Sequence, residues 1–227
     1  MLDAARAGYV GVAITYGFAP KHPFPAQVQD SKCAVRWLRA HAPQCKIDKE
    51  HIGAFGFSAG GNLACMLGAT DGKEFKVSGG NAEQSDRVQA VVSFYGMLNL
   101  PEFDRCSKKM PGVESSMIGY SLTRYLGGSR EQCGERYVKA SPGSYVGKDT
   151  APTFLVHGTE DKLVPISQSR DYEARLKKNG VDVTLLEVKG ERHNFGGEAE
   201  QKALKAMFEF LDKRLKRRAD AERTAGK

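Results

Sequence analysis

The 227-residue sequence lacks the features that mark membrane-spanning and exported chains. It has no run of about 18 apolar residues, so no membrane-spanning helix is expected. It also has no cationic start followed by an apolar stretch and a small-residue cleavage site, so no signal peptide is expected within this chain. A secreted and a cytoplasmic location both stay open.

The sequence is also poor in metal-binding patterns. Its five cysteines form no CxxC motif and no Cys/His cluster with zinc spacing. We therefore expect no metal ion and no cofactor. Cys106 and Cys133 share one irregular stretch, and a disulfide between them is left open.

Positive charge is spread unevenly along the chain. The formal net charge is +7, and residues 201–227 hold nine Lys or Arg against four Asp or Glu, which is +5 of that total. No aromatic or glycine-rich nucleic-acid motif accompanies these cations, so nucleic acid is not an expected partner. We interpret residues 219–227 as a basic disordered tail behind a helix end, where the helix dipole favours cations.

Segments typical of strands and helices alternate along the rest of the chain. Near-continuous apolar strands alternating with helices predict a mostly parallel sheet covered on both faces, a three-layer α/β/α sandwich. The length suits a single domain over residues 1–218. Expected strands cover residues 9–18, 51–57, 87–96, 153–158 and 181–190, and expected helices cover residues 26–42, 59–70, 166–180 and 198–218.

The periodic pattern fails between residues 98 and 150, which are rich in Gly, Ser, Lys and Pro. A stretch of that length without clear elements inside a compact domain is typical of a functional lid or of disorder. We interpret it as a lid insertion over the carboxyl ends of the strands, with one short helix in "SLTRYLG".

The stretch "GFSAGG", residues 56–61, lies between an expected strand and an expected helix. A serine held on a tight turn at that position projects its oxygen above the sheet, as a nucleophile requires. Gly56 and Gly60 would remove side chains that collide with the neighbouring strand and helix. The backbone N–H of Ala59, at the helix N-terminus, would point at a developing oxyanion. Ser58 is therefore the candidate nucleophile, and a plain turn residue is the alternative.

A nucleophilic hydroxyl needs a base and an orienting carboxylate, which follow it in the order Ser, Asp/Glu, His in this arrangement. Asp161 lies just past the expected strand 153–158, and His193 lies just past the expected strand 181–190. The carboxyl ends of parallel strands are where open α/β sheets bind ligands. We predict a Ser58–His193–Asp161 triad, with Glu160 and Asp149 as rival carboxylates.

Four stretches, "YGFAPKHPFPAQ", "GFSAGG", "HGTEDKLVP" and "HNFGG", resemble the esterase/lipase branch of the α/β-hydrolase family. The likeness is greatest to acetyl-esterase and feruloyl-esterase-like enzymes, and it covers nearly the whole chain. The resemblance implies Ser58 as nucleophile, His193 as general base, Asp161 as orienting acid and Ala59 as oxyanion donor. It implies a serine carboxylesterase that hydrolyses short acyl esters, small or polysaccharide-linked, through an acyl-enzyme.

The chain departs from that family at its start. Family members carry a His-Gly-Gly-Gly-type stretch that supplies further oxyanion N–H groups, and this sequence has none. Residues 1–18 match the helix and strand that follow that stretch, so the first strands are expected to be missing. The expected strand 9–18 must then pair with strand 51–57, shift, fray, or swap between chains in a homodimer.

The departure leaves two further hypotheses open. One is a vestigial or non-catalytic ligand-binding member that has lost the oxyanion loop. The other stays within serine hydrolases, as a peptidase or thioesterase, because a triad does not name the leaving group.

Overall fold

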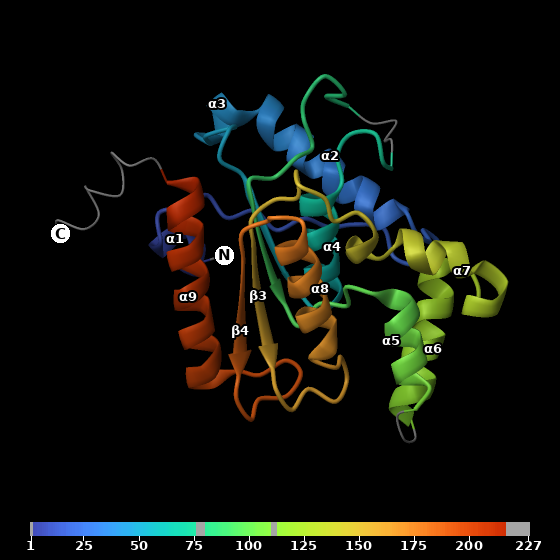
Figure 1. Ribbon diagram of the computed structural model, residues 1–227. Helices are drawn as coiled ribbons and strands as arrows, with labels where there is room; N and C mark the ends of the chain where they lie inside the picture. Colours follow the sequence, from blue (N-terminus) through green and yellow to red (C-terminus); the bar gives the residue numbers. More distant parts are fainter. Residues whose placement is uncertain (1, 76–79, 110–112, 217–227) are drawn as a thin grey trace.

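The computed structural model describes residues 2–75, 80–109 and 113–216 (Figure 1). Its sheet has four parallel strands in the order β1-β2-β3-β4, each next to its sequence neighbour. All four fall within strands predicted from the sequence. They are β1 (Gly53–Phe57), β2 (Ala90–Phe94), β3 (Thr153–Gly158) and β4 (Val183–Val188).

Helices cover both faces of this sheet, which confirms the predicted α/β sandwich. Helices α4 and α8 lie on one face and α9 on the other, as Figure 1 shows. Each corresponds to a predicted helix. The helices outside the lid region are α1 (Leu2–Arg6), α2 (Ala26–Ala40), α3 (Ala42–Cys45), α4 (Ala59–Ala69), α8 (Ser167–Lys178) and α9 (Gly197–Leu215).

Apolar packing on the two faces fixes the layers. Val91 and Leu155 of the sheet pack with residues of α2, α4 and α8 in one buried cluster. Val92 and Val156, one position further along their strands, pack with α9 in another. Successive strand residues thus point to opposite faces, and both faces are buried, as expected for a parallel sheet.

The register brings the carboxyl ends of the strands to one edge. Phe57 pairs with Phe94, Phe94 with Val156, and Val156 with Leu186. The loops that leave β1, β2, β3 and β4 therefore start side by side. This edge is where the sequence places the three candidate triad residues.

Residues 9–18 form no strand, contrary to the prediction. Tyr9 is anchored, because its hydroxyl donates to Asp212 of α9 at 2.6 Å and its ring stacks on Phe208. Beyond it, Val10, Val12 and Ile14 are 56, 47 and 39% exposed. A cleft of about 760 Å³ lies between this segment and β1. A strand needs a neighbour to satisfy its backbone groups, and across that cleft neither segment supplies one to the other.

The lid region is more regular than its sequence suggests. It contains α5 (Leu100–Ser107), α6 (Val113–Leu126), α7 (Arg130–Lys139) and a short 3-10 helix, η1 (Pro142–Ser144). Local signals explain where two of these helices begin. At the start of α5 the Asn99 side chain accepts a hydrogen bond from the Glu102 N–H, and at the start of α7 Ser129 and Gln132 form a capping box. These helices lie to one side of the sandwich, beyond α4 and α8 (Figure 1).

The two cysteines of this region are free thiols, so the open question of a disulfide is answered by their separate partners. Cys106 Sγ lies 3.2 Å from a carboxylate oxygen of Glu102, and Cys133 Sγ lies 3.2 Å from the Ser129 carbonyl oxygen. The predicted basic tail, residues 219–227, lies outside the described residues. Among the described helices, none combines the length and apolar character that crossing a bilayer requires.

Candidate functional site

Ser58 stands on a strained turn between β1 and α4. Its backbone has φ 51° and ψ −114°, a positive φ that few residues other than glycine adopt. Two hydrogen bonds hold it there: its N–H donates to the Phe94 carbonyl at 2.9 Å, and its own carbonyl accepts from the Asn62 N–H at 3.1 Å. Strain of this kind persists only where surrounding structure fixes it, and it is common at active sites.

The glycines around Ser58 allow the turn, but not all in the predicted way. A Cβ on Gly56 would lie 2.2 Å from the backbone oxygen of Gly60, so strand and helix can touch only without it. A Cβ on Gly60 itself would meet nothing within 4 Å, which corrects the predicted collision there. Gly61 is the tighter position on the helix, since its Cβ would lie 2.6 Å from Ser93 Oγ.

The structure brings the three predicted side chains together. His193 Nε2 lies 3.1 Å from Ser58 Oγ, and His193 Nδ1 lies 2.7 Å from Asp161 Oδ2. Asp161 is inaccessible to solvent at its side chain and His193 is 15% exposed. The hydroxyl, imidazole and carboxylate thus form one chain of hydrogen bonds that crosses from the end of β1 to the loops after β3 and β4.

Asp161, rather than either rival carboxylate, contacts His193. Glu160 and Asp149 are both exposed, and neither contacts His193 in the described part of the chain. Asp161 Oδ1 also accepts the backbone N–H groups of Leu163 and Val164, at 2.9 and 2.8 Å.

These contacts keep Asp161 ionised despite its burial. Burial alone would raise the pKa of this carboxyl, but hydrogen bonds from His157, His193 and the Val164 N–H outweigh it and lower the pKa to about 2. Asp161 is therefore a charged acceptor for the His193 ring at neutral pH, which favours the tautomer whose Nδ1 carries the proton. In that tautomer Nε2 is free to accept from Ser58.

His157, at the end of β3, also contacts the Asp161 carboxylate. Its side chain is fully buried, with Nε2 2.8 Å from the Val164 carbonyl oxygen and 3.3 Å from Asp161 Oδ2. Both neighbours of Nε2 accept, so the proton sits on Nε2, and Nδ1 accepts from the Ser169 hydroxyl at 2.7 Å. His157 therefore fixes the loop that carries Asp161.

Tyr95 is a second contributor that sequence reasoning missed. Its ring meets the His193 ring edge-on, with centroids 4.6 Å apart, and its hydroxyl donates to Asn194 Oδ1 at 3.3 Å. Burial, followed by the carboxylates of Glu200 and Asp161, raises the pKa of Tyr95 to about 12, so it stays a neutral donor. The available signal was its place at the carboxyl end of the expected strand 87–96.

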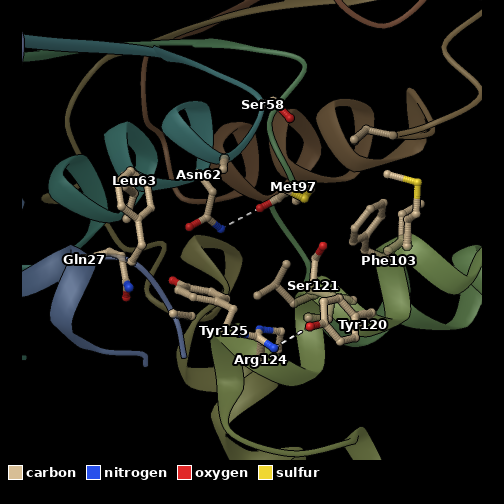
Figure 2. A pocket seen from close by; sticks show the side chains of 18 of the residues that line it. Gln27, Ser58, Asn62, Leu63, Met97, Phe103, Tyr120, Ser121, Arg124 and Tyr125 are labelled. Carbon is tan, nitrogen blue, oxygen red and sulfur yellow. Dashed lines mark hydrogen bonds between the residues drawn. The ribbon is translucent and has the colours of Figure 1, made fainter. Parts of the chain in front are cut away.

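An apolar cleft of about 620 Å³ opens beside Ser58 and runs to the helices of the lid region. Figure 2 shows Ser58 on one side of it and residues of α6 on the other. The backbone N–H of Ala59, the first residue of α4, has no partner within its helix and borders the same space. Most of the other lining residues are apolar or aromatic, among them Leu63, Met97, Leu100, Phe103, Ile118, Leu122 and Val164.

In the described part of the chain, no three His, Cys, Asp or Glu side chains lie close enough together to hold a metal ion. The site thus consists of a strained serine, a histidine, a buried carboxylate, a helix N-terminus and an apolar cleft.

The model of the BD-FAE family matches residues 1–176. The chain belongs to the BD-FAE family. Among solved structures, this BD-FAE chain is similar to a truncated form of a carbohydrate esterase from gut microbiota, with a TM-score of 0.79 and 26% identity over 92% of this chain and 75% of the other. That likeness supports the α/β-hydrolase fold.

Several curated relatives of this BD-FAE chain carry esterase names. It is 44% identical over 189 residues to an arylesterase of Saccharolobus solfataricus, covering 82% of this chain and 58% of the relative. It is 29% identical over 197 residues to the esterase LipQ of Mycobacterium tuberculosis, covering 86% of this chain and 45% of the relative. The chain spans between 40 and 46% of the length of the first three curated relatives that it matches.

Proposed function

We propose that this chain carries the catalytic site of a serine carboxylesterase that acts on short acyl esters. One observation carries the proposal: His193 lies within hydrogen-bond distance of both Ser58 Oγ and Asp161 Oδ2, at 3.1 and 2.7 Å. A base within about 2.6–3.2 Å of a nucleophile, itself oriented by a third group, is the arrangement that activates a hydroxyl. The esterase relatives support the same reaction class.

In the first half of the reaction Ser58 Oγ attacks the ester carbonyl carbon while His193 Nε2 takes the hydroxyl proton. The carbonyl oxygen becomes an oxyanion, which the Ala59 N–H stabilises as a hydrogen-bond donor. The tetrahedral intermediate then loses the alcohol, whose oxygen receives the proton from His193. The acyl group remains bonded to Ser58.

In the second half a water molecule gives a proton to His193 and attacks the acyl carbon. The second tetrahedral intermediate releases the carboxylic acid, and Ser58 Oγ regains its proton from His193. Asp161 stays ionised throughout and stabilises the imidazolium form, consistent with a pKa lowered to about 2.

The apolar cleft receives the acyl group in this proposal. It begins at Ser58 and Ala59, and residues of α5 and α6 line its far side, which supports a lid role for the inserted residues 98–150. The alcohol part of the substrate, small or polysaccharide-linked, would lie on the open side.

The test is labelling with a fluorophosphonate together with hydrolysis of p-nitrophenyl acetate. We expect both in the native chain and neither in Ser58→Ala. Ser116→Ala, which changes an exposed serine of α6, is the matched control and should keep both. Native protein that folds but shows neither labelling nor hydrolysis would support the alternative of a vestigial ligand-binding member.

A further inference from the structure

Arg124 is the one charged residue among those that line the cleft in the described part of the chain. It lies on α6, on the side of the cleft away from Ser58 (Figure 2). A half-buried cation at the end of an apolar cleft is costly to keep without a compensating partner.

A neighbouring aromatic ring holds the guanidinium in place. The Arg124 Cζ lies 5.0 Å from the centroid of Tyr120, one turn earlier on the same helix, and Nη1 donates to the Tyr120 hydroxyl. Within the described residues no Asp or Glu lies within ion-pair distance of Arg124. Arg105 and Arg170, by contrast, pair with Glu102 and Glu187.

The guanidinium can therefore serve a ligand. It has five N–H donors in a fixed fork, and Tyr120 uses one of them. A carboxylate matches that fork with two parallel hydrogen bonds, and such charge-assisted bonds are stronger than neutral ones. Ser121, next to Tyr120 on the same helix, adds a hydroxyl to this end of the cleft.

We propose that the cleft takes esters that carry a carboxylate remote from the scissile bond, with Arg124 as the carboxylate's partner. This inference rests on the proposed esterase function. It names the substrate class: an ester with an apolar stem between the reacting carbonyl and an anionic end.

The experiment compares matched anionic and neutral esters. One pair carries the charge in the acyl part: mono-p-nitrophenyl glutarate against its neutral methyl ester. A second pair carries it in the alcohol part: 4-acetoxybenzoate against methyl 4-acetoxybenzoate. The quantity measured is the anionic-to-neutral ratio of kcat/KM, in the native chain, Arg124→Gln, Arg124→Lys and the control Arg105→Gln.

We expect Arg124→Gln to lower that ratio about tenfold or more in one pair, as loss of a hydrogen bond to a charged group implies. The pair affected identifies which part of the ester reaches Arg124. Arg124→Lys should restore part of the ratio, and Arg105→Gln should leave it unchanged. Raising the salt concentration should reduce the ratio in the native chain but not in Arg124→Gln.

Equal ratios in the native chain and Arg124→Gln, for both pairs, would overturn the inference while leaving the esterase function intact. If the native chain hydrolyses no ester at all, the proposed function fails, and binding decides the inference separately. In that case calorimetry uses the amide analogues of the two anionic esters, glutaranilic acid and 4-acetamidobenzoate, and one of them should bind the native chain and lose that binding in Arg124→Gln. If neither analogue binds the native chain, or if Arg124→Gln binds both as the native chain does, the role of Arg124 is refuted.

Discussion

Replacing His157 by Leu tests how the candidate triad is supported. Leucine approximates the size of the ring but removes its three polar contacts, to Val164, Asp161 and Ser169. Because His157 is fully buried, water cannot replace them. The Val164 carbonyl loses its His157 contact, and the Ser169 hydroxyl loses its acceptor.

The expected loss of stability follows from those two groups. Each buried polar group left without a partner costs about 1–3 kcal/mol, so the variant should lose about 2–6 kcal/mol of unfolding free energy. Ser169→Ala leaves only the His157 Nδ1 atom without its donor and should lose about 1–3 kcal/mol. The assay is urea denaturation of the three proteins under the same conditions.

Activity should follow the position of Asp161. In His157→Gln, whose amide can still donate to Val164, the fold should survive while the carboxylate loses its original support. We expect kcat for p-nitrophenyl acetate to fall by about tenfold or more, because small misplacements of catalytic groups reach about 10²-fold. KM should change little, since His157 does not line the cleft. A His157→Leu protein with native stability, or a His157→Gln protein with native kcat, would refute the reasoning.

Three further predictions concern the turn, the carboxylate and the cleft. Gly56→Ala should lower the unfolding free energy by about 3 kcal/mol or more, because the added Cβ would collide with the backbone of Gly60. Gly60→Ala, whose added Cβ meets nothing within 4 Å, should change it by at most about 1 kcal/mol. Thermal melting of the two variants tests the difference. The pKa of Asp161 is about 2 in the folded protein and about 3.9 in an unfolded chain. Its carboxylate therefore stabilises the fold by about 2–3 kcal/mol above about pH 4, and this stabilisation is lost as the pH falls towards 2. Urea denaturation should therefore show a stability gap between native protein and Asp161→Asn that shrinks below about pH 4; a constant gap contradicts it. Leu122→Trp should fill the cleft and so reduce the ratio of kcat/KM for p-nitrophenyl hexanoate to that for p-nitrophenyl acetate. Thr123→Trp, which changes the exposed neighbouring residue, should leave that ratio unchanged. Equal ratios in the two variants would contradict the proposal that the cleft receives the acyl group.

Much of the fold was predictable because its signals are local. Apolar runs bounded by Gly and polar loops marked β1 to β4, and parallel topology then required their carboxyl ends to meet at one edge. The proximity of Ser58, Asp161 and His193 follows from that geometry, although they lie far apart in sequence. The sequence favours Asp161 but leaves Glu160 as a rival, because excluding Glu160 needs side-chain directions, which only the structure supplies.

The failures share a non-local cause. Residues 9–18 have strand composition, but strand formation also needs a partner, and the composition of a segment does not contain that information. The reverse holds for residues 98–150: their helices pack on one another, and apolar residues such as Phe103 and Leu122 join one buried cluster, which no local periodicity reveals. The role of His157 was hidden because it depends on contacts with the loop after β3 and with helix α8, which the sequence does not place around it.

The unpaired side of β1 has a consequence for local opening of the chain. Since Ser58 N–H bonds to Phe94, alternate amides towards the strand start also face β2, and those of Gly53, Phe55 and Phe57 face the open side. Deuterium exchange along β1 should therefore alternate between slow and fast from one amide to the next. β1, which ends just before Ser58, is hydrogen-bonded to one neighbouring strand, whereas β2 and β3 are each hydrogen-bonded to two. The segment leading into the serine should thus open at a lower free-energy cost than β2 and β3.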